Sequence, residues 1–413
     1  MRTILAGLLF ATACTGSIDD PGDVDPNLPP STDVKVVVKD RYTPQASVRV
    51  IFQDAAGTLL SDALTDTNGA AEISMTAGNV TVIRTYPIPT TGTERRPNDV
   101  YTYVGVKAGD LLELGNDESN GTAGAIVVKV PEGANGTVKV STPCGSGQGT
   151  APNVAITVTD CPTMMDFYVV DGDNSSFYKK APYAENVDLA TEVLSGNLAA
   201  TLGATNVPTG AQVNIEERVV AGTFSLYSSG QKRVDQTPAQ VNLPNVTGVE
   251  QLVLAQIQAT EGRQMVAMRS SYSASPVIFD AAANLIPYVS TVEYKPTGIT
   301  WMETGTGTGT ADAVIVRMNV TRGGVQSPEN EYVRTIIAPH GGATLALPVL
   351  PDALYNLGMM DQIAGTHGLI KATGGYDKLR GKAFSVANPI EIAPTDGGVT
   401  LSYAGNPPVR PAD

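Results

Sequence analysis

The sequence predicts an all-β protein of several tandem β-sandwich domains, of the immunoglobulin or transthyretin-like type, with very little helix. The first observation is a period-two alternation of apolar residues, the pattern of half-buried strands, which is clearest at Val34, Val36 and Val38. The second is the density of turn formers, since 42 Gly and 28 Pro interrupt the chain. The third is size, because 413 residues with 42% hydrophobic content can form more than one core.

The first segment, residues 1–13, reads as a signal peptide. Arg2 precedes a short apolar run, and a spanning helix would need about 20 apolar residues. The run ends in Ala-Thr-Ala before Cys14, which resembles the lipobox of bacterial lipoprotein signal peptides. The resemblance implies that Cys14 is the lipid attachment site, although this chain has Ala11 where the family prefers Leu. An ordinary cleaved signal with a stray cysteine, or an N-terminal helix, is the alternative.

Residues 14–32 are expected to form a disordered, acidic, Pro-rich tether, because so few apolar groups cannot offset the entropy of ordering. Lipid on Cys14 would make the membrane a partner and place the protein in the cell envelope. Thr15 differs from the Asp that retains some lipoproteins at the inner membrane. The resemblance therefore implies an outer-membrane lipoprotein that faces the periplasm or the surface.

Residues 33–108 are expected to form one β-sandwich. The stretch VRVIFQDAAGTLLSDALTDTNGAAEISMTAGNVTVI has strands separated by Asp-x-x-Gly turns. It resembles the carboxypeptidase regulatory-like domains, which are small transthyretin-like β-sandwiches. Relatives of that fold bind starch-like glycans or serve as spacers in surface proteins, so a carbohydrate-binding-like fold is implied.

The rest of the chain continues the theme. Residues 109–290 are expected to form a β-sandwich region of one or two small units, with strand-like segments at 212–220 and 251–259. Residues 291–408 are expected to form a C-terminal sandwich with a short helix at 351–357, and 409–413 a tail. The segments ALPVLPDAL and GGYDKLRG loosely resemble uncharacterised lipoproteins of predatory (myxobacterial) species, a likeness that implies no activity.

Charge and cysteine usage agree with an extracellular protein. The net charge of −14 argues against nucleic acid, which rewards basic patches. Of three cysteines, Cys144 and Cys161 remain after Cys14, and in an oxidising compartment the default is a disulfide. Between two strands of a simple hairpin these cysteines would lie at opposite ends. The bridge therefore requires a folded-back 145–153 segment or a crossing between sheets.

Residues that could carry chemistry are few. The only histidines, His340 and His367, lack partners at metal-ligand spacing and are expected in loops in water. The Gly-rich segment 145–149 lacks a P-loop lysine and is expected to be a loop. Asp171 and Asp173 are weak calcium candidates, with a hairpin turn as the alternative.

Exposed aromatics are the remaining candidates for ligand contact. Glycans stack on such rings, and Tyr86, Tyr101, Tyr103 and Trp301 are weak candidates, with packing on core or strand faces as the favoured alternative. No cofactor is expected. The sequence favours a non-catalytic, lipid-anchored structural, adhesion or ligand-recognition module with a glycan or protein ligand. A carbohydrate-binding module and an envelope hydrolase with an unrecognised acidic site are the alternatives, and the oligomeric state is open.

Overall fold

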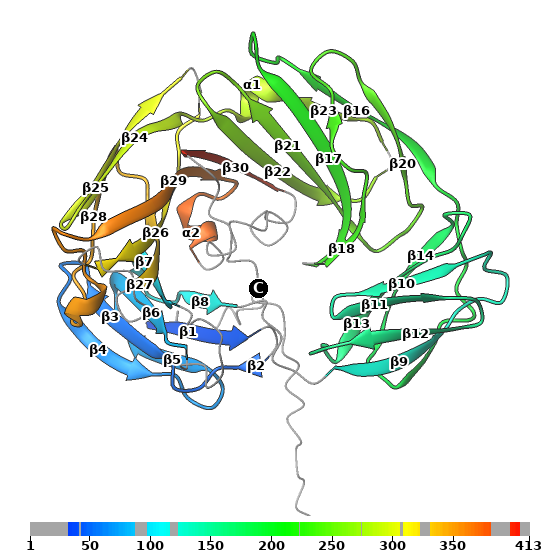
Figure 1. Ribbon diagram of the computed structural model, residues 1–413, viewed down its shortest axis with the longest axis horizontal. Coiled ribbons are helices and arrows are strands. Elements are labelled where there is room, and N and C mark those ends of the chain that lie inside the picture. The colour runs from blue at the N-terminus through cyan, green and yellow to red at the C-terminus, as the bar shows by residue number, and fades with distance from the viewer. Residues whose placement is uncertain are drawn as a thin grey trace, which may run out of the picture.

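The computed structural model describes residues 32–40, 43–86, 97–115, 123–222, 224–273, 275–305, 309–322, 331–380 and 397–404. Strands dominate these residues, and the two α-helices among them have four residues each, so the predicted all-β class is confirmed. The strands form four packed units, which follow one another along an arc (Figure 1).

The first unit is a sandwich of two layers. One layer has the order β2-β1-β5, with β8 parallel to β1 on its other side, and the second has the order β7-β6-β3-β4. The strands are β1 (Asp33–Asp40), β2 (Thr43–Pro44), β3 (Arg49–Asp54), β4 (Leu59–Leu64), β5 (Ala70–Ser74), β6 (Ala77–Arg84), β7 (Asn98–Lys107) and β8 (Leu111–Leu114). The predicted inward face of β1 packs as expected, since Val34, Val36 and Val38 are fully buried.

Strands β3 and β6 are buried on both faces. Val50 and Val80 pack inside the first unit, whereas Ile51 and Ile83 pack into the core of the fourth unit. Ile51 lies on the opposite face of β3 from Val50 and Phe52, and it is fully buried as well. The continuous apolar runs of these strands are typical of strands covered on both sides.

The second unit is a seven-stranded sheet that encloses its own core. Its order is β14-β13-β10-β11-β12-β9-β15. The strands are β9 (Gly124–Lys129), β10 (Val138–Thr142), β11 (Gly145–Gly149), β12 (Asn153–Val158), β13 (Met164–Val170), β14 (Ser176–Pro182) and β15 (Asn186–Asp188).

The Gly-rich segment predicted as a loop is instead strand β11, which pairs with β10 and β12. A Cβ at Gly145 or Gly147 would come within 2.0 or 2.3 Å of a β12 carbonyl oxygen, so only glycine allows this approach. Because β11 folds the chain back between β10 and β12, Cys144 and Cys161 lie close together. They form the expected disulfide, with a Cα–Cα distance of 5.2 Å.

The third unit packs a small sheet of order β20-β16-β23 on the strands β18-β17-β21-β22. The strands are β16 (Leu198–Thr205), β17 (Gln212–Ala221), β18 (Phe224–Ser228), β19 (Lys232–Arg233), β20 (Ala239–Leu243), β21 (Glu250–Gln258), β22 (Arg263–Ser271) and β23 (Val277–Asp280). The strands expected at 212–220 and 251–259 are confirmed as β17 and β21, and they pair with each other.

The fourth unit packs the sheet β24-β25-β28 on the strands β30-β29-β26-β27. Its elements are α1 (Ala281–Asn284), β24 (Tyr288–Lys295), β25 (Gly298–Thr304), β26 (Ala313–Thr321), β27 (Glu331–Pro339), β28 (Thr344–Ala346), η3 (Ala353–Tyr355), β29 (Gln362–Ala372), α2 (Tyr376–Leu379) and β30 (Gly397–Ala404). The helix expected at 351–357 is only the single 3₁₀ turn η3, capped by Asp352.

One continuous sheet joins three of the units. Its thirteen strands run β18-β17-β21-β22-β30-β29-β26-β27-β7-β6-β3-β4, with β19 also on β17. The third and fourth units meet where β22 pairs with β30, and the fourth and first meet where β27 runs parallel to β7. Figure 1 shows this sheet following the arc from β4 to β18.

An ion-pair network fixes α2 against the first unit. Arg380, which is 2% exposed, donates to Asp110 at 2.7 Å and to Asp377 at 2.8 Å. Its guanidinium also donates to the carbonyl of Gly105 at 3.2 Å. Burial would lower the pKa of Arg380, but hydrogen bonds with both carboxylates outweigh it and raise that pKa. The guanidinium therefore stays charged, and it ties the end of α2 to the first unit.

We expect Arg380→Ala to lower the free energy of unfolding by about 3 kcal/mol, because Asp110 loses its buried partner. Urea denaturation measures the change. The control is Lys295→Ala, which removes an exposed pair with Glu293 and should cost under about 1 kcal/mol. Equal losses in the two variants would contradict a structural role for this network.

Candidate functional site

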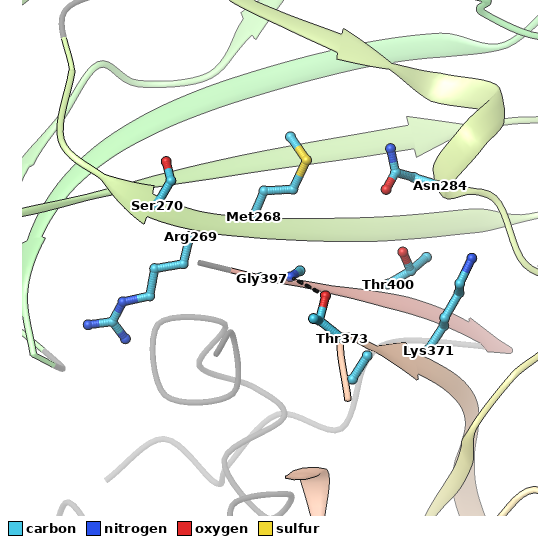
Figure 2. Close-up of a pocket in the computed structure, with 10 residues that line it drawn as sticks. Met268, Arg269, Ser270, Asn284, Lys371, Thr373, Gly397 and Thr400 are labelled. Atoms are coloured by element: carbon cyan, nitrogen blue, oxygen red, sulfur yellow. Dashed lines mark hydrogen bonds between the residues drawn. The ribbon is translucent and has the colours of Figure 1, made fainter. Parts of the chain in front are cut away.

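A pocket of about 440 Å³ lies at the seam between the third and fourth units, where β22 pairs with β30 (Figure 2). Strand β29 and the end of α1 complete its lining. Its lining includes Met268 and Ser270 from β22, Asn284 from α1, Lys371 from β29, Thr373 just after β29, and Thr400 from β30.

Gly398 makes the hollow. It is paired with Met268 on one side, and on the other its carbonyl accepts a hydrogen bond from the backbone N–H of Thr373. Paired residues in a sheet direct their side chains to the same face, so a side chain at 398 would stand between Met268 and Thr373. A Cβ there would lie 3.5 Å from Met268 Cγ. Its absence leaves the centre of this sheet face open.

The charge in the pocket comes from Lys371. Arg269 also borders it, but Figure 2 shows that side chain pointing away from Met268, to the other face of β22. There its Nε donates to Glu250 at 2.9 Å and its Nη2 to the carbonyl of Gly222 at 2.7 Å. Within the described part of the chain, Lys371 makes no ion pair, and the lining includes no acidic residue.

The two histidines and the only tryptophan come together in the fourth unit. Glu303 accepts hydrogen bonds from Trp301 Nε1 at 2.9 Å and from His340 Nε2 at 2.7 Å. The ring of His367 packs on Trp301 with centroids 4.3 Å apart. The expectation of loop histidines in water is wrong for His367, which is a strand residue that is 1% exposed. His340 does lie in a loop, just after β27, but it is only partly exposed and is hydrogen-bonded to Glu303.

Burial lowers the pKa of His367 to about 4, so the ring is neutral near pH 7. Burial alone would raise the pKa of Glu303, but hydrogen bonds from His340 and Trp301 outweigh it and lower that pKa. Such an arrangement holds the fourth-unit core together. No sequence pattern predicts this cluster, because its members belong to separate strands and loops.

The aromatic candidates do not form an exposed platform. Tyr103 is fully buried in the first core, and Trp301, at 5% exposure, lies in the fourth. Tyr86 donates its hydroxyl to Asp99 at 2.6 Å, and Tyr101 packs against the first core. These positions follow the core-packing reading of the sequence.

The calcium candidates lie in the turn between β13 and β14. Asp171 Oδ1 accepts the N–H groups of Asp173 at 3.0 Å and Ser175 at 2.9 Å. Asp173 accepts from the Asn135 amide at 2.7 Å. Both carboxylates thus already have donors, as in the hairpin-turn alternative, and the described residues contain no cluster of three or more potential metal ligands.

A buried acid lies near the contact between the second and third units. Glu217 in β17 is fully buried and accepts from the amide of Gln251, while its Oε2 has no partner. Burial raises its pKa to about 7, against the effect of that hydrogen bond. Tyr227 and Tyr272 are close enough for Glu217 to raise their pKa values further, after burial itself.

This acid makes stability depend on pH. Because the folded-state pKa of Glu217 lies above its ordinary value of 4.5, its stabilisation is present below pH 4.5 and is lost as the pH rises through 7. Between pH 5 and pH 8 the free energy of unfolding should therefore fall by about 2 kcal/mol less in Glu217→Gln than in the unchanged protein. Chemical denaturation at each pH measures it.

The control is Glu261→Gln, which changes an exposed acid and should leave the pH profile as it is. His367 contributes the opposite slope, since its folded pKa of about 4 lies below 6.5 and costs stability as the pH falls between these values. An unchanged profile in Glu217→Gln would contradict a protonated buried acid.

The predicted lipid attachment site, Cys14, lies outside the described residues, together with the signal peptide and most of the tether. The described helices are too short to cross a bilayer. Lipid attachment therefore stays a prediction from the sequence.

Comparison with known proteins adds little. No family model and no curated protein matches the chain. Among solved structures, the TIE protein of Bacillus anthracis aligns at 13% identity over 60% of this chain, with a TM-score of 0.16, and the match spans only half of that protein. BcpA, the major pilin subunit of Bacillus cereus, aligns at 9% identity over 60% of this chain and 98% of its own, with a TM-score of 0.14. Similarities this low carry no argument about function.

Proposed function

We propose that this chain is a non-catalytic module of the bacterial cell envelope, a rigid scaffold for adhesion or ligand recognition. The observation that carries the proposal is the thirteen-stranded sheet, which runs through the first, third and fourth units. Units joined by flexible linkers move independently by default, whereas these share main-chain hydrogen bonds and cores. A protein that holds a surface at a fixed geometry needs such joints.

The interior joints support the same reading. Ile51, Ile83 and Val100 of the first unit are part of the fourth unit's core. The second unit contacts the third through an apolar cluster that includes Tyr168 and Val219. Separating any pair of units would expose apolar surface, at roughly 25 cal/mol for each Å².

The polar groups with perturbed pKa values also have structural explanations. Asp54 and Asp66 accept backbone N–H groups in tight turns, which lower their pKa values. Glu217 and His367 are buried within the units, away from solvent. Catalytic groups are usually perturbed in an accessible cleft, so this distribution favours a scaffold over a hydrolase.

The coupling between units can be tested with Trp301 fluorescence, which reports on the fourth unit alone. We expect Val34→Ala, in the first core, to lower the unfolding temperature seen by Trp301 by roughly 2–5 °C. The matched control is Val140→Ala in the second core, which is equally buried but lies outside the continuous sheet, so it should shift the Trp301 transition less. A Trp301 transition insensitive to Val34→Ala would mean that the units are independent.

Membrane attachment through Cys14 is the envelope part of the proposal. We expect Cys14→Ala to move the protein from the membrane fraction to the soluble fraction, because no acyl chains can then be attached. Thr15→Ala is the control and should stay with the membrane. If Cys14→Ala remains in the membrane fraction, the lipid anchor is wrong.

A further inference from the structure

We infer that the seam pocket binds a sugar acid, a hydroxylated carboxylate of monosaccharide size. The inference rests on the proposed function, because it gives the recognition module a class of ligand. It concerns none of the aromatic positions considered from the sequence, none of which lines this pocket.

Size and shape fit such a ligand. Ligand pockets typically measure 300–1,000 Å³, and this one measures about 440 Å³. Its floor is a sheet face opened by Gly398, flanked by the thioether of Met268. A sugar ring presents one apolar C–H face, which can rest on this floor while its hydroxyls reach the rim.

Charge selects an acid over a neutral sugar. The protein has a net charge of −14, yet among the described residues the pocket lining contains two basic residues and no acidic one. Arg269 is already held by Glu250, which leaves the half-buried Lys371 as the cation for a ligand. An ammonium that is partly buried and has no ion pair with the residues that the structure describes favours a carboxylate more than an exposed ammonium would, because solvent screens it less.

The neutral groups supply hydroxyl recognition. Thr373 Oγ1 accepts the N–H of Gly398 at 3.0 Å, which leaves its own O–H to donate. Asn284 donates through Nδ2 to the carbonyl of Asp280 at 2.8 Å, so its Oδ1 can accept. Thr400 is paired with Lys371 across β29 and β30, so the two side chains stand on the same face of the sheet, and both line the pocket. These donors and acceptors surround one volume, as Figure 2 shows.

Position adds a consequence for stability. The lining comes from the third unit through Met268 and Ser270 and from the fourth through Lys371, Thr373 and Thr400. Pockets between domains are common ligand sites, and a ligand there contacts both sides of the seam. Binding should therefore raise the unfolding temperature of the protein.

The test uses the full chain and titration calorimetry with D-glucuronate and D-galacturonate. D-glucose and D-galactose are the neutral arms, and acetate and inorganic phosphate are the simple-anion arms. We expect at least one acid to bind about 10- to 100-fold more tightly than its neutral parent, the gain typical of one charged hydrogen bond. We also expect it to bind more tightly than either simple anion.

Variants locate the site. Lys371→Gln should reduce affinity for the acid to that for the neutral sugar, whereas Lys180→Gln, an exposed lysine of β14, should leave it unchanged. Gly398→Val fills the floor and should weaken both acid and neutral sugar. An unchanged Trp301 unfolding temperature without ligand shows that either variant still folds.

Three results would overturn the inference: no heat of binding with either acid, equal binding of acetate or phosphate, or acid binding that survives Lys371→Gln. The proposed scaffold is judged separately by the Val34→Ala and Cys14→Ala experiments. The ligand assignment can therefore fail in calorimetry while the scaffold proposal is still supported or rejected by its own two experiments.

Discussion

The parallel pairing of β7 with β27 is the constraint on which the rest of the structure depends. It joins residues Asn98 to Tyr103 with Tyr332 to Ile337, across the second and third units that intervene in the chain. Without it, each strand would present an unpaired row of backbone groups at a sheet edge, beside apolar side chains. The pairing satisfies those groups and places the first unit against the fourth, so that the chain closes into one arc (Figure 1).

Strand β27 also carries a buried cation. Arg334 on β27 is fully buried, and it donates to the carbonyls of Pro348 at 2.9 Å and Tyr355 at 3.3 Å. Burial lowers its pKa to about 10, so it remains charged near pH 7. These bonds hold the segment after β28 over the sheet. The Arg334 guanidinium thus links two parts of the fourth unit, and the Arg380 guanidinium links the fourth unit to the first.

The same continuous sheet explains why a pocket is found at its other joint. Where β22 meets β30, the covering layer changes from the sheet containing β23 to the sheet containing β24, with α1 between them. Where one packed sheet ends and the next begins, the face of the continuous sheet is open to solvent unless large side chains fill the gap. Gly398 leaves it unfilled, and Lys371 gives it a charge opposite to that of the protein as a whole.

The sequence by itself determined what depends on neighbouring residues. Period-two patterns and turn formers established the strands, and an even pair of cysteines established the disulfide between Cys144 and Cys161. Only the tertiary structure decided which strands pair, which strands are buried on both faces, and that His367 is buried against Trp301. The physical reason is that a strand's pattern records whether a face is apolar, whereas the partner that buries it lies far away in the chain.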